Sequence, residues 1–177
     1  MSYTENKAQK KYSTIKQASN ILNSVDTTCI SDQVKSVISK CSYFFLSTAS
    51  KDAQPNINFK GGDKGFVHVL DKNTIIFPDI LGNGILHGIN DIMQNPNIAM
   101  LFIDFITGVR YKVNGLATVI DNTEELNKYL DFSGFDYPTR IIKVDVNYVI
   151  GNCSKNIDNV RKEIIDYEEN WESPCGT

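Results

Sequence analysis

The sequence has few residues of the kinds that build metal or disulfide sites. Only four cysteines and two histidines occur among the 177 residues, and no two cysteines form a CxxC pair. Ligand spacing is the main sequence sign of a zinc site, so no metal site is predicted. Reduced thiols are the simplest interpretation of these cysteines, and they favour a cytoplasmic protein.

Long apolar runs and an excess of positive charge are missing as well. No apolar run approaches the roughly 20 residues that span a bilayer, so no membrane segment is expected. Residues 1–17 lack the apolar stretch of a signal peptide, so we do not expect export. The formal net charge of −3 disfavours nucleic-acid binding, which usually needs a basic surface. Walker A, Rossmann and catalytic-triad patterns are absent, which leaves nucleotide hydrolysis and acyl transfer without support.

What is present is the composition of a folded domain, with 41% hydrophobic and 22% charged residues. The length suits one domain with extensions. Residues 1–30 are polar with weak helical spacing and predict an N-terminal helical arm. Residues 31–157 form the main domain, which begins with a short helix capped by Ser31. Residues 158–177 predict a C-terminal helical extension.

Short alternating or apolar segments follow one another within the main domain. The clearest are residues 43–49, 55–61, 74–79 and 140–152. We interpret them as about six antiparallel strands joined by short turns, with one helix inserted at about residues 84–94. This pattern predicts a mainly β fold with flanking helices, as a small closed or split barrel. The absence of regular strand–helix alternation argues against a parallel sheet.

One face of strand 55–61 is polar. Asn56, Asn58 and Lys60 alternate along it, about 7 Å apart in steps of two residues. This face is either a solvated surface or the lining of a cleft, where Lys60 would supply positive charge. Two glycines follow Lys60 and would allow close approach of a flat ligand.

A glycine-flanked polar loop follows the apolar strand that ends in "FPD". Pro78 cannot donate to a ladder, so the strand is expected to end or turn outward there. Gly82, Asn83 and Gly84 then come just before the predicted helix. The loop is either a plain turn or an anion site, because helix N-termini present unpaired N–H groups and a positive dipole end.

Polar or titratable side chains occur at three further places in the predicted elements. Arg110 shares a strand face with Lys112 and Asn114, and that face is either solvated or able to bind phosphate. His87 lies among apolar residues of the predicted helix, so we expect a half-buried packing residue. His68 is expected on the opposite side of its strand from its valine neighbours.

The order of these pieces resembles the pyridoxamine 5'-phosphate oxidase-like family of flavin-binding split barrels. The resemblance rests on "KGGDKGFVHVLD", "PDILGN", "DIMQNPNIAMLF", "VNG" and "VDVNYVIGNCSKNI", and it covers about residues 37–157. It implies a six-stranded antiparallel split β-barrel that forms a homodimer, with FMN bound in clefts at the subunit interface.

The resemblance also implies roles for individual residues. Lys60 would reach the flavin phosphate, the loop at 78–84 would wrap it, and Arg110 would contribute from the neighbouring subunit. The stretch "NCSKN" would lie near the site. The implied cofactor-binding residues are Asn58, Phe59, Lys60, Gly61, Phe77, Pro78, Asp79, Gly82, Asn83, Gly84, Arg110, Asn152, Cys153 and Lys155.

The sequence departs from true pyridoxamine phosphate oxidases at two places. They carry an Arg-Lys pair where this chain has Gly84 and Ile85, and they have an arginine-rich substrate segment that does not occur after residue 157. Oxidation of pyridoxamine phosphate is therefore not expected. The main hypothesis is an FMN-dependent oxidoreductase acting on a small molecule, with NAD(P)H as a candidate donor. The alternatives are a non-enzymatic flavin- or haem-binding protein and a barrel that has lost its cofactor.

Overall fold

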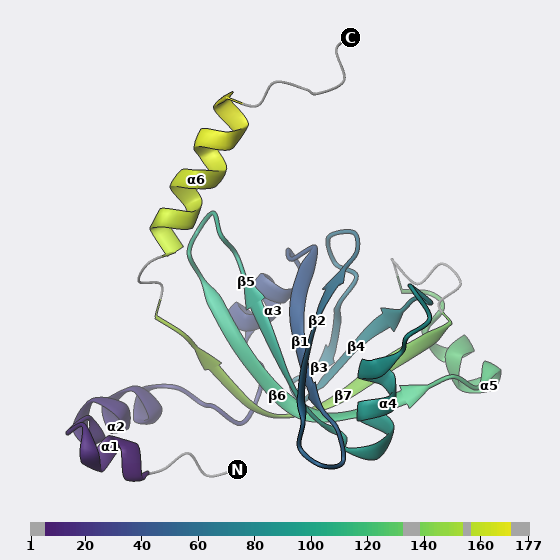
Figure 1. The fold of residues 1–177 in the computed structure, drawn as a ribbon, viewed down its shortest axis with the longest axis horizontal. Helices are drawn as coiled ribbons and strands as arrows, with labels where there is room; N and C mark the ends of the chain where they lie inside the picture. Colours follow the sequence, from purple (N-terminus) through teal and green to yellow (C-terminus); the bar gives the residue numbers. More distant parts are fainter. Residues whose placement is uncertain (1–5, 133–138, 154–156, 171–177) are drawn as a thin grey trace.

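The computed structural model describes residues 6–132, 139–153 and 157–170 of the chain. Its strands form one curved sheet with helices around it (Figure 1). The strands are β1 (Tyr43–Ala49), β2 (Pro55–Gly61), β3 (His68–Asp71), β4 (Thr74–Asp79), β5 (Asn97–Ile103), β6 (Arg110–Ile120) and β7 (Arg140–Gly151). The helices are α1 (Lys7–Lys11), α2 (Ile15–Ser24), α3 (Asp32–Ile38), α4 (His87–Gln94), α5 (Thr123–Leu126), the 3₁₀ turn η1 (Asn127–Tyr129) and α6 (Ile157–Asn170).

The sheet is antiparallel throughout, in the order β2-β1-β5-β6-β7-β4-β3. Its two edge strands, β2 and β3, are not hydrogen-bonded to each other, which makes the curved sheet a split barrel. The described residues contain seven strands rather than the predicted six, because the short hairpin of β3 and β4 contributes two. The mainly β class with flanking helices is confirmed.

Local sequence signals account for several element boundaries. The Ser31 side chain accepts a hydrogen bond from the backbone N–H of Val34 and begins α3, as predicted. Asn122 caps α5 in the same way, through the N–H of Glu125. The inserted helix is shorter than predicted, since α4 begins at His87 rather than near Gly84. The loop before it contains left-handed backbone at Gly84 and Leu86, which a continuous helix cannot include.

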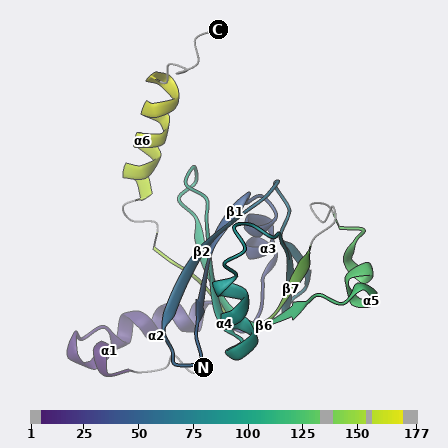
Figure 2. The same cartoon turned by 45° about the vertical axis from the view of Figure 1, so that its right-hand side comes forward.

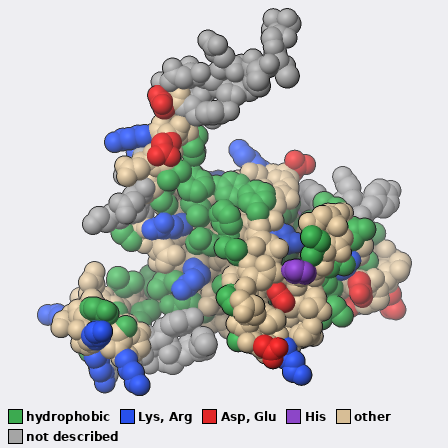
Figure 3. Space-filling view, in the orientation of Figure 1, with side chains coloured by type: hydrophobic (Ala, Val, Ile, Leu, Met, Phe, Trp, Pro, Cys, Tyr) green, Lys and Arg blue, Asp and Glu red, His purple; other side chains and the backbone are tan. Residues whose placement is uncertain are grey.

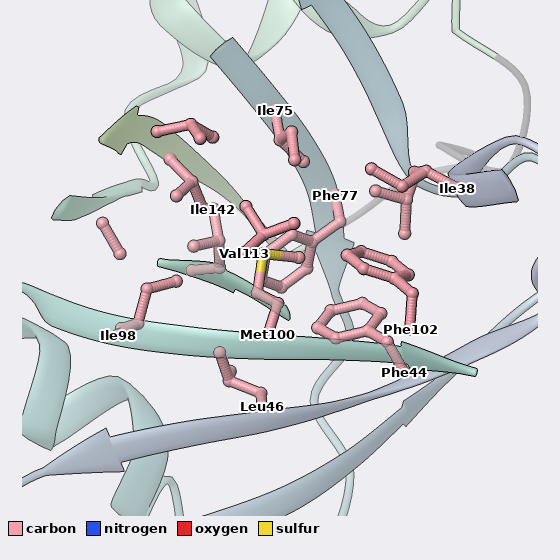
Figure 4. Close-up of a cluster of buried hydrophobic side chains, with 14 of the residues drawn as sticks. Ile38, Phe44, Leu46, Ile75, Phe77, Ile98, Met100, Phe102, Val113 and Ile142 are labelled. Carbon is pink, nitrogen blue, oxygen red and sulfur yellow. The ribbon is translucent and has the colours of Figure 1, made fainter. Parts of the chain in front are cut away.

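The core lies inside the curved sheet and is built from alternating residues of its strands. Phe44 is fully buried, and its ring centroid lies 5.0 Å from that of Phe77, 5.1 Å from Phe102 and 5.9 Å from Phe66. Figure 4 shows these rings from β1, β4 and β5 meeting near Met100 and Val113. This aromatic cluster connects strands from both halves of the barrel.

Gly115 allows β6 and β7 to approach closely where their register shifts. A Cβ at this position would lie 2.6 Å from the carbonyl oxygen of Asp145 and 2.7 Å from a methyl of Val144. We therefore expect Gly115→Ala to lower the free energy of unfolding by about 1–3 kcal/mol, measured by urea denaturation. Gly82→Ala is the control, because nothing lies within 4 Å of its added Cβ. Equal stability of the two variants would contradict this account of β6 and β7.

The terminal helices pack less closely than the barrel. No residue of α1 or α2 is buried, although α2 places Ile21 and Leu22 beside Tyr148 of β7. Helix α6 projects from the end of the barrel (Figures 1 and 2), where Ile157 is buried and Arg161 bonds to the carbonyl of Ile106. Among the described residues, no helix has the length and apolarity needed to cross a membrane.

Candidate functional site

An ion pair crosses the split in the barrel. Lys60 of β2 places Nζ 2.5 Å from the carboxylate of Asp79, the last residue of β4. These strands belong to opposite ends of the sheet order, and β3 pairs with β4 only as far as Ile76. Asp79 also accepts a hydrogen bond from Nε of Arg140 at 3.1 Å. The Asp79 side chain is 3% exposed, so this carboxylate is held between two cations.

Two adjoining clefts flank this ion pair and share Lys60, Asp79 and Ile80. The first, of about 340 Å³, lies between the polar face of β2, the loop after β4 and the start of α4. The second, of about 370 Å³, lies between Gly61–Asp63 and the end of β4. Their sizes are in the range of small-molecule sites. The polar face of β2 is thus the lining of a cleft and not simply a solvated surface.

Hydrogen-bond donors without a protein partner lie at the first cleft, which Asn58 and the start of α4 line. Nδ2 of Asn58 is buried and has no partner, which is costly unless a ligand or water accepts its hydrogen bond. Helix α4 begins at this cleft without a side-chain cap, so its first N–H groups lack such a partner. Gly82 and Gly84 line the same space with no side chain. These features fit an anionic ligand that carries several acceptor oxygens.

A buried polar network fixes α4 against the sheet. Asp91 of α4 is 7% exposed and accepts hydrogen bonds from the Thr48 hydroxyl at 2.7 Å and from the Asn56 amide at 3.2 Å. Because Asn56 lies on β2, the network holds the helix start next to Asn58 and Lys60. The neutral donors satisfy the Asp91 carboxylate without a cation, so its role is to position the helix.

His87 is not the half-buried packing residue that we predicted. It is exposed at the first position of α4 and lines the first cleft. The start of α4 lies after the left-handed Leu86, and this places the imidazole outside the apolar face that Ile89 and Ile92 bury. Next to it the loop exposes large apolar side chains, with Ile80 at 72% and Ile85 at 60%.

Most of the predicted cofactor-binding residues line one of the two clefts. They are Asn58, Lys60, Gly61, Pro78, Asp79, Gly82, Asn83 and Gly84. Phe59 does not, because strand alternation turns it to the outer face of β2, where it is 64% exposed and stacks on Tyr43. Phe77 does not either, because its ring is fully buried in the aromatic core.

Arg110, Asn152 and Cys153 form a separate group where β6 begins and β7 ends. The Arg110 guanidinium bonds to the carbonyl of Cys153, and the Asn152 N–H bonds to the carbonyl of Arg110. None of these three residues lines either cleft at the split of the same chain. Lys155 lies outside the described residues.

Cys29 and Cys41 do not have the lowered pKa of reactive thiols. Burial, with a contribution from the charge of Asp104, raises the pKa of the Cys41 thiol to about 11. A hydrogen bond to Asp26 raises the pKa of Cys29 as well. Both groups therefore remain protonated at neutral pH. Within the described ranges there is no group of three or more His, Cys, Asp and Glu side chains that could hold a metal ion.

Arg140 is the charged residue of the site that the sequence analysis missed. It faces Asp79 because the two are partners in the pairing of β4 with β7. Sixty-one residues separate them, so no local pattern indicates the contact. The one sequence sign of this contact was that Arg140 is the first residue of an apolar strand and Asp79 is the last residue of another.

Taken together, a split barrel with a polar cleft at its split defines a class of small-ligand-binding proteins. The sequence profile of the pyridoxamine 5'-phosphate oxidase family matches residues 30–153. The chain therefore belongs to the pyridoxamine 5'-phosphate oxidase family. No curated protein matches the chain.

Several solved structures have a similar fold. A putative pyridoxamine 5'-phosphate oxidase from Lactobacillus delbrueckii is 16% identical with a TM-score of 0.57, over 71% of this chain and 97% of that one. HupZ from Group A Streptococcus is 19% identical with a TM-score of 0.53, over 69% and 93%. A conserved protein of unknown function from Corynebacterium diphtheriae is 18% identical with a TM-score of 0.51, over 70% and 94%. At these identities the likeness concerns the fold alone.

Proposed function

We propose that this protein binds FMN at the split of the barrel and acts as an FMN-dependent oxidoreductase on a small molecule. The observation that carries the proposal is the convergence in one cleft of Lys60, the unpaired amide of Asn58 and the uncapped start of α4. Together they provide a cation and several N–H donors for a phosphate. NAD(P)H is our candidate for the electron donor.

The residues present fit this cofactor, whose flavin ring supplies the hydride chemistry when bound. Lys60, held in place by Asp79, would bind the phosphate, and Asn58 would donate to an acceptor of the ligand. The apolar side chains of Ile80 and Ile85 would cover the ligand and exclude water. Family membership supports flavin binding, while Gly84 and Ile85 still argue against pyridoxamine phosphate as the substrate.

We further propose that the protein is a homodimer through the outer face of the sheet. Ile57 and Phe59 are 70% and 64% exposed on the edge strand β2. Tyr43 and Phe45 extend the same surface on β1, with ring contacts to Phe59. Figure 3 shows hydrophobic side chains gathered over this part of the sheet. A large apolar patch of this kind is typical of an interaction surface.

Phe59→Asp is expected to convert the dimer to a monomer, because it places a charge in the centre of that apolar surface. The measurement is the molar mass by light scattering after gel filtration. Met93→Asp is the matched control, since Met93 is 74% exposed on α4 and lies outside this face. A dimer that persists in Phe59→Asp would exclude this interface.

The proposed cofactor is tested by the absorption spectrum of the purified protein, as isolated and after titration with FMN and gel filtration. We expect flavin bands at about one FMN per chain, because the two adjoining clefts of each chain share Lys60 and Asp79 and would form one site. Turnover of NAD(P)H with an added acceptor then separates an oxidoreductase from a flavin-storage protein. A protein that retains no chromophore would support the alternative of a barrel that has lost its cofactor.

One observation favours haem as the second candidate ligand. His87 is exposed at the first cleft, and an imidazole there could serve as an axial ligand. A Soret band that disappears in His87→Ala would establish this alternative. Flavin bands that survive the same substitution would support the FMN proposal.

A further inference from the structure

The charge of the phosphate site depends on a carboxylate inside it. Asp79 lies between Lys60, whose side chain is 26% exposed toward the clefts, and Arg140, which is 12% exposed. Arg140 lines neither cleft, so it does not contact a ligand there, and its charge lies behind Asp79. One oxygen of Asp79 pairs with each cation. The carboxylate therefore fixes the position of Lys60 and also cancels one of the two positive charges.

Two cations and one carboxylate leave a net charge of about +1. The other ionisable side chains that line the two clefts are His87, counted as neutral at pH 7, and the exposed carboxylate of Asp63. With histidine counted as neutral, Asp63 lowers the formal charge at the second cleft further, so the net charge of the site does not exceed about +1. A phosphate monoester carries about −1.5 to −2 at pH 7, so the site does not neutralise it fully. A group with a single negative charge would be matched.

We propose that Asp79 is a specificity-determining residue that adapts this site to a monoanionic group rather than to a phosphate dianion. The proposal rests on flavin binding at the split, as proposed above. Its consequence is that the second negative charge of FMN adds little to the affinity of the protein for FMN. Removing the charge of Asp79 would restore the preference for a dianion, because the carboxylate lies beside the cation that the phosphate contacts.

The test compares three ligands that share one ring and chain and differ in charge: riboflavin, riboflavin 5'-sulfate and FMN. Dissociation constants are measured by quenching of flavin fluorescence at fixed ionic strength and neutral pH. For the native protein we expect FMN and the sulfate to bind within about threefold of each other. In Asp79→Asn the ratio should shift roughly tenfold toward FMN, as expected for one unit charge removed a few ångströms away.

Asp79→Glu is the matched variant, since it keeps the charge and should keep the native ratio. A general loss of structure would weaken all three ligands together, so the ratio separates specificity from folding. If Asp79→Asn does not fold, the comparison of FMN with the sulfate in the native protein decides whether the proposal holds. If the native protein binds FMN more than tenfold more tightly than the sulfate, the proposal is overturned. Another cation must then contact the phosphate. Arg110 of a second copy is the first candidate, and Arg110→Gln tests it. An unchanged ratio in Asp79→Asn overturns the proposal too.

The outcomes also separate this inference from the proposed function. If all three flavins bind but the ratio of the affinities for FMN and the sulfate differs from the expected one, the role of Asp79 is refuted. The proposal of flavin binding is then unaffected. Failure of every flavin to bind would refute both.

Discussion

Lys60→Ala is expected to weaken FMN binding about 10- to 100-fold, equivalent to about 1.4–2.7 kcal/mol. Among the described residues that line the two clefts, Lys60 is the one lysine or arginine, and it lines both. Its loss would also leave the carboxylate of Asp79 beside the phosphate with Arg140 as its remaining cation. Riboflavin, which lacks the phosphate, should bind the variant within about threefold of its affinity for the native protein.

The measurement is the dissociation constant for FMN and for riboflavin, at two salt concentrations. The difference between the two ligands should shrink at high salt, because screening weakens an exposed ion pair. Lys64→Ala is the matched control, since it removes the same charge from an exposed residue that lines neither cleft. Unchanged FMN affinity in Lys60→Ala would contradict the role that we assign to this side chain.

Phe44→Ala is expected to lower the free energy of unfolding by about 3–5 kcal/mol. Its ring is fully buried and contacts rings from both sides of the barrel, so the substitution leaves a cavity that the surrounding strands cannot fill. Urea denaturation followed by far-UV circular dichroism measures the change. Native and variant proteins must be compared at one protomer concentration, because the proposed dimerisation would add to apparent stability.

Tyr12→Ala is the aromatic control for this substitution. Tyr12 is 68% exposed in the N-terminal arm, and its removal should change the stability by no more than about 0.5 kcal/mol. If Phe44→Ala does not fold, Phe44→Leu should show a smaller loss of about 1 kcal/mol. A loss below that value in Phe44→Ala would mean that the aromatic cluster does not hold the two halves together.

Short-range patterns were sufficient for most of the fold. Alternation in residues 55–61 and 140–152 identified β2 and β7, and Ser31 marked the start of α3, because these signals depend on neighbours within four residues. The antiparallel barrel also followed from the short spacing of the strands. The prediction of about six strands was one short of the seven in the described residues.

The sequence also identified the polar face of β2 and the glycine loop as candidate ligand contacts. It could not exclude a solvated face or a plain turn, because the same residues serve in both settings. The tertiary structure shows that both line a cleft, because it brings the two edges of the sheet together around Lys60 and Asp79.

The sequence by itself determined the class of fold, the family resemblance and the residues that carry charge in the cleft. The tertiary structure decided how those charges combine, and it showed that Arg140 pairs with Asp79. It also showed that His87 is exposed at the first cleft, whereas Phe59 and Phe77 do not line it. The physical reason is that alternation and capping are local properties of the chain. Strand register and closure of the split, by contrast, place residues together that are far apart in sequence.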